Sequence, residues 1–215
     1  MPKLIDHTER KKVISQAVWK LLIEQGISAI TIRNVAAEAE LSTGSLRHSF
    51  DSRVELVTYA LDLIGKEAES NLRSIPFNQQ NPLDIVRALE IFIPLTSRTQ
   101  AMASITLGMI AELKSTPEIK EVAASYYRRI RSLIYDLLLR LQEAGHLQEG
   151  INLNSQANYL TTLCYGLSTT YIIGGPGTEP QALSRIFRRS MNKILIHPVP
   201  YLQAEDCEQT PAQQG

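Results

Sequence analysis

The spacing of apolar residues is the feature that most constrains the fold of this chain. Between Thr8 and Gln25 the apolar residues recur every three or four positions, which places them on one face of an α-helix. The same spacing continues through most of the sequence. No segment shows the convincing apolar–polar alternation that marks a half-buried strand. The sequence therefore predicts an all-α protein.

Capping residues and helix breakers divide this pattern into elements. Thr8 is a suitable N-cap for the first helix, and Gly26 fits the position just after its end. The segment 74–82 is rich in Pro, Asn and Gln and is predicted to be a loop. The remaining helices are predicted at 32–39, 43–50, 52–73, 83–96, 99–115, 118–145, 155–174 and 179–196.

Composition excludes several classes of protein. The 215 residues are 44% hydrophobic and 20% charged, and no apolar run approaches the roughly 18 residues that span a bilayer. The N-terminus lacks the apolar core of a secretory signal, so we expect a soluble, cytoplasmic protein with no membrane partner. The two cysteines, Cys164 and Cys207, do not have the spacing of a zinc site or a disulfide framework. We expect no metal and no cofactor.

The short helices predicted at 32–39 and 43–50 are joined by a tight turn, the pattern of a helix-turn-helix whose second helix enters the major groove of DNA. Such a helix needs small residues for close approach and longer donors for phosphates or base edges. The N–H groups at helix starts can also face phosphates. The residues that meet these needs are Thr31, Ser42, Thr43, Gly44, Ser45, Arg47 and His48. Residues 1–53 have eight basic and six acidic residues, a small positive excess that permits phosphate binding.

About a quarter of the chain also matches a known pattern in a single register. The matching residues are Ala17, Gly26, the run from Thr31 to Ala36, the run from Leu41 to Leu46, Phe50, and the run from Asp51 to Leu56. With these residues, the stretch from Arg10 to Leu56 resembles the DNA-binding domain of the TetR family of repressors. The resemblance implies DNA contacts from Arg33, Thr43, Gly44, Ser45, Arg47, His48 and Arg53. Arg33 and Arg53 could instead be solvated surface charges, and His48 could be surface packing.

Three positions depart from the family pattern. Glu40 stands in the turn where the family usually has Gly, so a residue with a side chain must adopt the turn conformation at some energetic cost. Arg47 replaces a Tyr whose hydroxyl meets a phosphate, and it can offer a charged contact instead. Arg53 replaces a Lys. The fold prediction survives these changes.

The C-terminal part carries a second resemblance. Through the runs from Tyr126 to Arg131, from Ala144 to Leu147 and from Tyr165 to Leu167, the stretch from Pro117 to Leu195 is similar to the C-terminal domain of the BetI-type subgroup. Tyr165 replaces an Asp common in that subgroup, and we do not carry the subgroup's choline ligand over. The resemblance implies a small-molecule pocket inside the helical bundle and a dimer built from the last two helices.

Residues of suitable type can be named for both features. A pocket of this kind is mostly apolar with a few polar groups, and the candidates are Phe92, Met102, Ser104, Thr106, Leu107, Met109, Tyr126, Tyr127 and Ile130. For each of them taken singly, plain core is the favoured interpretation. Stripes at helical spacing on the last two helices suggest a dimer interface formed by Leu160, Cys164, Leu167, Ser168, Tyr171, Phe187, Met191 and Ile194. The alternative is an intramolecular core.

Together these patterns predict an N-terminal helix-turn-helix domain at 1–53, with the helix-turn-helix at about 31–50. A long helix joins it to a ligand-sensing and dimerisation bundle at 54–197, followed by a disordered tail at 198–215. The predicted function is that of a homodimeric repressor, released from a palindromic operator in double-stranded DNA by an unknown small-molecule effector.

Other functions fit the sequence less well. The histidines have no metal-ligand spacing, and there is no nucleophile elbow, Walker A loop or dinucleotide fingerprint, so no catalytic residue is predicted and an enzyme is disfavoured. A helical small-molecule-binding or adapter protein that does not act on DNA remains the alternative. Sequence does not separate a repressor from an activator.

Overall fold

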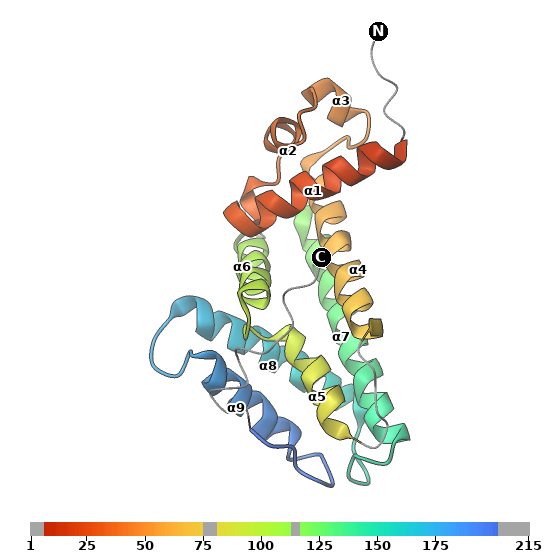
Figure 1. Cartoon of the computed structure of the whole chain (residues 1–215), viewed down its shortest axis with the longest axis vertical. Helices are drawn as coiled ribbons and strands as arrows, with labels where there is room; N and C mark the ends of the chain where they lie inside the picture. The colour runs from red at the N-terminus through yellow and green to blue at the C-terminus, as the bar shows by residue number, and fades with distance from the viewer. Residues whose placement is uncertain (1–6, 75–80, 113–116, 202–215) are drawn as a thin grey trace. The chain divides into compact units, whose positions relative to one another are not determined.

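The computed structural model describes residues 7–74, 81–112 and 117–201. Within these ranges the chain forms α-helices and short 3₁₀ helices and no β-sheet, which confirms the predicted all-α class (Figure 1). The elements are α1 (His7–Gln25), η1 (Ile27–Ala29), α2 (Ile32–Glu38), α3 (Thr43–Arg47), α4 (Arg53–Ser74), α5 (Pro82–Leu89), η2 (Glu90–Phe92), α6 (Ser97–Glu112), α7 (Ile119–Glu143), α8 (Leu153–Ile173) and α9 (Pro180–Met191). No helix in the described ranges is long and apolar enough to cross a membrane.

The described residues divide into two compact units. Unit 1 contains residues 7–67, 105–112 and 117–126, and unit 2 contains residues 68–74, 81–104 and 127–201. Helices α4, α6 and α7 each contribute residues to both units. The boundary in α4 differs from the predicted one after residue 53, because Leu56, Val57 and Ala60 of this helix are fully buried in unit 1.

In unit 1, α1 buries the stripe that its sequence predicts, with Ile14, Val18 and Leu22 all at most 2% exposed. It packs against α2 and η1, and α2 packs against α3. Helix α6 also reaches this unit. A Cβ atom placed on Gly108 of α6 would lie 3.0 Å from the side chain of Ile27 in η1. The absence of a side chain at position 108 therefore permits this close approach.

The turn between α2 and α3 is closed by two backbone hydrogen bonds. Leu41 N–H donates to the Ala36 carbonyl at 2.8 Å and Glu40 N–H donates to the Ala37 carbonyl at 3.2 Å, the pair of bonds of a Schellman motif. This motif places Glu40 at a positive φ of 54°, the one non-glycine residue of the described chain in that region. Helix α7 ends with the same motif, but there Gly145 takes the left-handed position. The turn is thus formed as predicted, with the strain that a side chain at position 40 implies.

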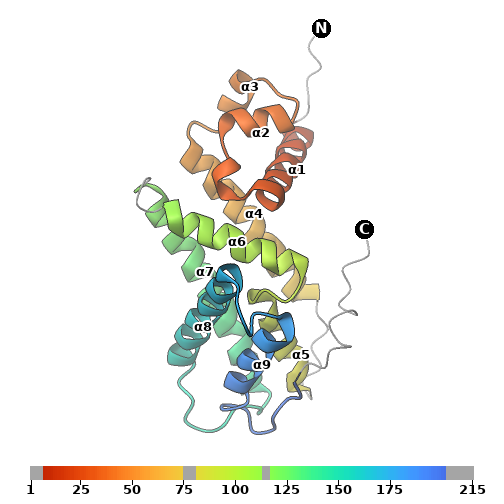
Figure 2. The same cartoon turned by 90° about the vertical axis from the view of Figure 1, so that its left-hand side faces the viewer.

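Unit 2 packs α5, α8, α9 and the second part of α7, and α8 and α9 lie side by side in both views (Figures 1 and 2). Its core contains a buried ion pair between Glu90 of η2 and Arg188 of α9. Arg188 donates through Nε and Nη2 to the two Glu90 carboxylate oxygens, each at 2.7 Å, and Ser184 Oγ donates to the same carboxylate at 2.6 Å. Arg188 and Glu90 are only 2% and 7% exposed.

The C-terminal segment differs from its prediction. Helix α9 ends at Met191 rather than near residue 196, and the chain then pairs Leu195 with Leu147. Val199, predicted to lie in a disordered tail, is 4% exposed, and Asn192 holds its backbone N–H and carbonyl at 2.9 and 3.0 Å. Val199 is therefore held against the end of α9, whereas Pro198, Pro200 and Tyr201 are exposed. Residues 202–215 of the predicted tail lie outside the described ranges.

Candidate DNA-binding surface and effector cavity

Both helices of the helix-turn-helix begin at hydroxyl N-caps. Thr31 Oγ1 accepts from Asn34 N–H at 3.1 Å, and Ser42 Oγ accepts from Ser45 N–H at 3.0 Å. These bonds satisfy backbone donors that the first turn of a helix leaves without a partner. The two predicted DNA-contact residues thus also fix where α2 and α3 begin.

Helix α3 has one buried face and one exposed face. Leu46 is fully buried and Phe50 is 9% exposed, which anchors α3 to α4 through a ring contact of 5.1 Å between Phe50 and Tyr59. The helix ends at Arg47, three residues before its predicted end, and the chain continues as a turn to Phe50. The predicted contact residues that are exposed on this part of unit 1 are Arg33, Ser42, Thr43, Gly44, Arg47 and His48.

Three predicted contact residues, Thr31, Ser45 and Arg53, are only partly exposed. Arg53, at the start of α4, donates from Nη2 to the carbonyl of Ile27 at 3.4 Å, so part of its guanidinium is used to hold η1. Ser45 offers its carbonyl to the guanidinium of Arg10 in α1. Arg10 is not among the predicted contact residues, although it lies one turn before Ile14 on the buried face of α1.

The predicted ligand-binding residues are distributed over both units. Thr106, Met109 and Tyr126 belong to unit 1, whereas Phe92, Met102, Ser104, Tyr127 and Ile130 belong to unit 2. Met109 and Ile130 are buried, and Tyr127 packs against Tyr165 with ring centroids 5.7 Å apart. The assignment of these residues to a pocket remains a prediction.

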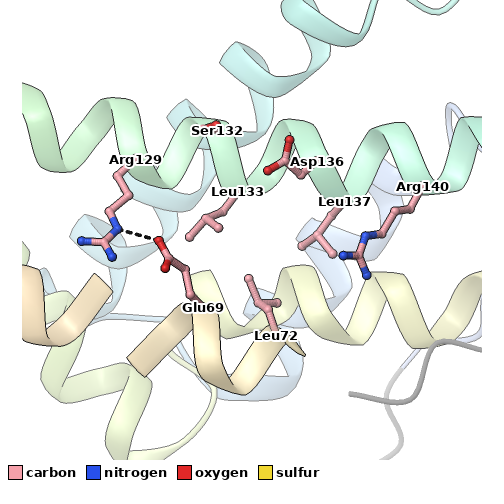
Figure 3. A pocket seen from close by; sticks show the side chains of 8 residues that line it. All are labelled: Glu69, Leu72, Arg129, Ser132, Leu133, Asp136, Leu137 and Arg140. Atoms are coloured by element: carbon pink, nitrogen blue, oxygen red, sulfur yellow. Dashed lines mark hydrogen bonds and ion pairs between the residues drawn. The ribbon is translucent and has the colours of Figure 1, made fainter. Parts of the chain in front are cut away.

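Unit 2 contains a cavity of about 350 Å³ between α4 and α7, and none of the predicted ligand-binding residues lines it (Figure 3). Three leucines form its apolar wall, while one end holds an ion pair in which Arg129 Nε donates to Glu69 Oε1 at 2.9 Å. The lining residues are Glu69, Leu72, Arg129, Ser132, Leu133, Asp136, Leu137 and Arg140. Five of the eight lining residues are polar or charged, so this cavity is more polar than a typical small-molecule pocket.

A sequence signal for this cavity does exist. The α7 lining residues are spaced by three or four positions from Arg129 to Arg140, so they share one helix face. That face mixes charged and apolar residues, so its spacing alone does not distinguish a cavity wall from a solvated surface. Only the pairing with the end of α4, which is a tertiary contact, closes the face into a cavity.

Most of the predicted dimer residues are buried within the single chain. Seven of the eight are buried within a single chain, with Leu160, Phe187 and Met191 fully so. Only Tyr171 is partly exposed. The stripes on α8 and α9 pack against the protein's own core, so a partner chain would have to contact the opposite faces of the two helices.

The outward faces of α8 and α9 carry a regular arrangement of apolar and small residues. On α8 the outward residues recur at helical spacing and include the exposed Tyr159 and Ile173, at 47% and 78%, while α9 exposes Ile186 at 44%. The α8 residues between them are small, and a Cβ atom on Gly166 would meet nothing within 4 Å. The face thus combines apolar side chains with small residues that allow a second helix to come close. Its outward residues are Tyr159, Thr162, Gly166, Thr170 and Ile173 of α8 and Ile186 of α9.

Comparison with known proteins agrees with this arrangement. Residues 14–60 match the model of the bacterial regulatory proteins of the tetR family, and residues 84–195 match that of the BetI-type transcriptional repressor C-terminal domain. The chain is 25% identical over 197 residues to the HTH-type transcriptional regulator PksA of Bacillus subtilis (strain 168), covering 91% of this chain and 95% of PksA. It is 26% identical over 137 residues to the regulator BetI of Rhizobium meliloti (strain 1021), covering 61% and 66%.

Solved structures show the same fold. One is a transcriptional regulator from Saccharomonospora viridis in complex with choline, with a TM-score of 0.71 and 19% identity over 89% of this chain and all of that one. Another is a TetR transcription regulator from Haloarcula marismortui ATCC 43049, with a TM-score of 0.69 and 15% identity over 87% and 99%. The N-terminal helix-turn-helix and the helical C-terminal part together define a DNA-binding transcriptional regulator. The chain belongs to the TetR family, with a BetI-type C-terminal domain.

Proposed function

We propose that the protein is a homodimeric repressor that binds a palindromic operator through α3 and leaves it when a small molecule binds in unit 2. The observation that carries the proposal is the division of α3. Leu46 anchors the helix in the core, while Thr43, Gly44 and Arg47 are exposed. Small residues beside a long donor suit close approach to a major groove.

The dimer is proposed to form through the outward face of α8 and α9. A palindromic operator needs two copies related by a twofold axis, with recognition helices about one DNA turn, roughly 34–36 Å, apart. Gly166→Glu with Ile173→Glu places two charges on this face and is expected to give a monomer in sedimentation experiments. Its operator affinity should fall at least about 100-fold. Gln142→Glu, at an exposed position of α7, is the matched control and should remain a dimer.

The effector is proposed to occupy the cavity between α4 and α7. Leucine side chains would hold its apolar body, and the Glu69–Arg129 pair and Asp136 would orient polar groups. Binding there would displace α4, which runs into unit 1 and bears Arg53 at its start, and would change the separation of the two recognition helices. A ligand weakens operator binding by its preference for the wrong separation.

The cavity can be tested with variants of one helix. Leu133→Trp fills the cavity and should abolish release by an effector without changing the operator affinity of the free protein. Leu139→Trp is the control, because Leu139 lies on α7, is partly exposed and does not line the cavity. Choline, present in the Saccharomonospora viridis structure, is the first compound to include in the screen.

Operator binding itself is tested by footprinting on the DNA beside the protein's own gene over a series of salt concentrations. Protection of a palindromic site, with affinity falling steeply as salt rises, is the expected result. A reporter downstream of that site separates repression from activation. If neither this DNA nor a genome-wide selection yields a protected site, the proposal fails and the protein is a helical binding protein that does not act on DNA.

A further inference from the structure

The end of the recognition helix leaves one carbonyl in need of a donor. In a longer α-helix, Ser49 N–H would donate to the carbonyl of Ser45. Here Ser49 N–H donates to the Leu46 carbonyl instead, at 2.9 Å, because α3 tightens into a turn after Arg47. The Ser45 carbonyl is thereby released from the helix while it is still part of the segment that would face DNA.

The donor that replaces Ser49 comes from α1. Arg10 Nη2 donates to the Ser45 carbonyl across 35 residues of sequence. Arg10 lies four residues before Ile14, so it continues the buried stripe of α1 by one turn, while its neighbours Lys11 and Lys12 are exposed. Position on this stripe, rather than charge alone, brings Arg10 beneath α3.

Arg10 and α3 both depend on this hydrogen bond. Arg10 Nε is buried with no hydrogen-bond partner among the described residues. The bond from Nη2 to the Ser45 carbonyl is therefore the main contact that offsets the cost of burying this part of the guanidinium. A five-residue helix is far below the length at which helices are stable alone, so α3 keeps its place through tertiary contacts. Leu46 supplies one such tertiary contact from the buried side of α3, and Arg10 supplies a second at the C-terminal end of the helix.

We propose that Arg10 is a positioning residue for DNA recognition, which sets the orientation of α3 by capping the Ser45 carbonyl. The proposal rests on the DNA-binding role of α3. It differs from the direct phosphate contact that a basic residue near this surface could make. A phosphate contact adds about one unit to the dependence of log affinity on log salt and strengthens binding to all sequences alike. A positioning contact strengthens binding to the specific sequence only.

The test compares Arg10→Gln with Lys12→Gln in the full-length protein. Both changes remove one positive charge from the same end of α1, but only the first removes the donor to Ser45. The probes are a duplex selected by the wild-type protein from random sequences and an unselected random duplex. Native-state hydrogen exchange of the amides of residues 46–50 reports on α3 in the absence of DNA.

For Arg10→Gln we expect faster exchange at residues 46–50 with little change in α1 and α2. Affinity for the selected duplex should fall about tenfold, while affinity for the random duplex and the salt dependence of binding stay as in the wild type. Lys12→Gln should leave the exchange of α3 unchanged.

Three results would overturn the proposal. Unchanged exchange at residues 46–50 would mean that the bond does not hold α3. Faster exchange throughout unit 1 would indicate a general contribution to stability. An equal loss on both duplexes, with a salt dependence reduced by about one unit, would identify a phosphate contact. If the wild type selects no duplex, the operator proposal fails, while the exchange comparison still decides whether Arg10 positions α3.

Discussion

Neutralising Glu90 should destabilise the protein far more than neutralising an exposed ion pair of the same length. The Glu90–Arg188 pair and the Asp62–Lys66 pair of α4 both have nitrogen–oxygen distances of 2.7 Å. The side chains of the first pair are 7% and 2% exposed, whereas those of the second are 39% and 67% exposed. The two pairs thus have equal nitrogen–oxygen distances and differ in how far their side chains are buried.

The expected free energies of unfolding follow from the charge left behind. Glu90→Gln leaves the Arg188 guanidinium buried without a counter-charge, and removing one partner of such a pair costs about 3–5 kcal/mol. We expect about 3 kcal/mol, because the amide oxygen of Gln can still accept one hydrogen bond and the Pro200 carbonyl still accepts from Nη1 at 2.6 Å. Lys66→Gln should cost less than about 0.5 kcal/mol, since water solvates the remaining carboxylate.

Thermal and urea unfolding at one fixed protein concentration measure both values, because the apparent stability of the proposed dimer would depend on concentration. For a chain of this size, 3 kcal/mol corresponds to a fall in Tm of about 6–12 °C. Glu90→Leu combined with Arg188→Met removes both charges and should return to within about 1 kcal/mol of the wild type. A Glu90→Gln loss no larger than that of Lys66→Gln would refute the reasoning.

Three further predictions concern single residues. Glu40→Gly should raise the free energy of unfolding by about 0.5–1 kcal/mol, because it relieves the positive φ, and Glu40→Ala should not; a less stable Gly variant in urea unfolding would contradict this. Arg47→Ala should weaken DNA binding on all sequences and lower its salt dependence by about one unit, as measured by fluorescence anisotropy, whereas an effect confined to one sequence would mark a base contact. Burial raises the pKa of Cys164 to about 12, so in a Cys207→Ser variant only about one thiol in ten thousand is ionised at pH 8. Ellman's reagent should detect no thiol in that variant until urea is added, and prompt reaction of the native form would show that Cys164 is accessible.

Local patterns in the sequence were sufficient for the helices of unit 1. The stripe on α1, the caps at Thr31 and Ser42 and the strained turn at Glu40 depend on residues a few positions apart, and all are present in the structure. Helix ends were less predictable. No helix-breaking residue directly follows Arg47, so the sequence does not predict that α3 ends there. This end is set by tertiary contacts.

Contacts between distant segments set the limit of prediction. Periodicity identifies an apolar stripe but not the molecule that covers it, so the stripe containing Leu160 and Phe187 was assigned to a partner chain although it covers the protein's own core. Glu90 and Arg188 resemble solvated charges in the sequence, and their 98-residue separation hides the pair. The cavity lining at Leu133 was missed for the same reason.

The close approach of α6 to η1 makes positions 27 and 108 mutually dependent in evolution. Any side chain at position 108 meets Ile27 at 3.0 Å, and the β-branched Ile27 has few alternative rotamers with which to yield. A library randomised at position 108 alone should therefore keep Gly under selection for a folded protein. A library randomised at both positions should recover Ala at 108 more often, together with a smaller residue at 27.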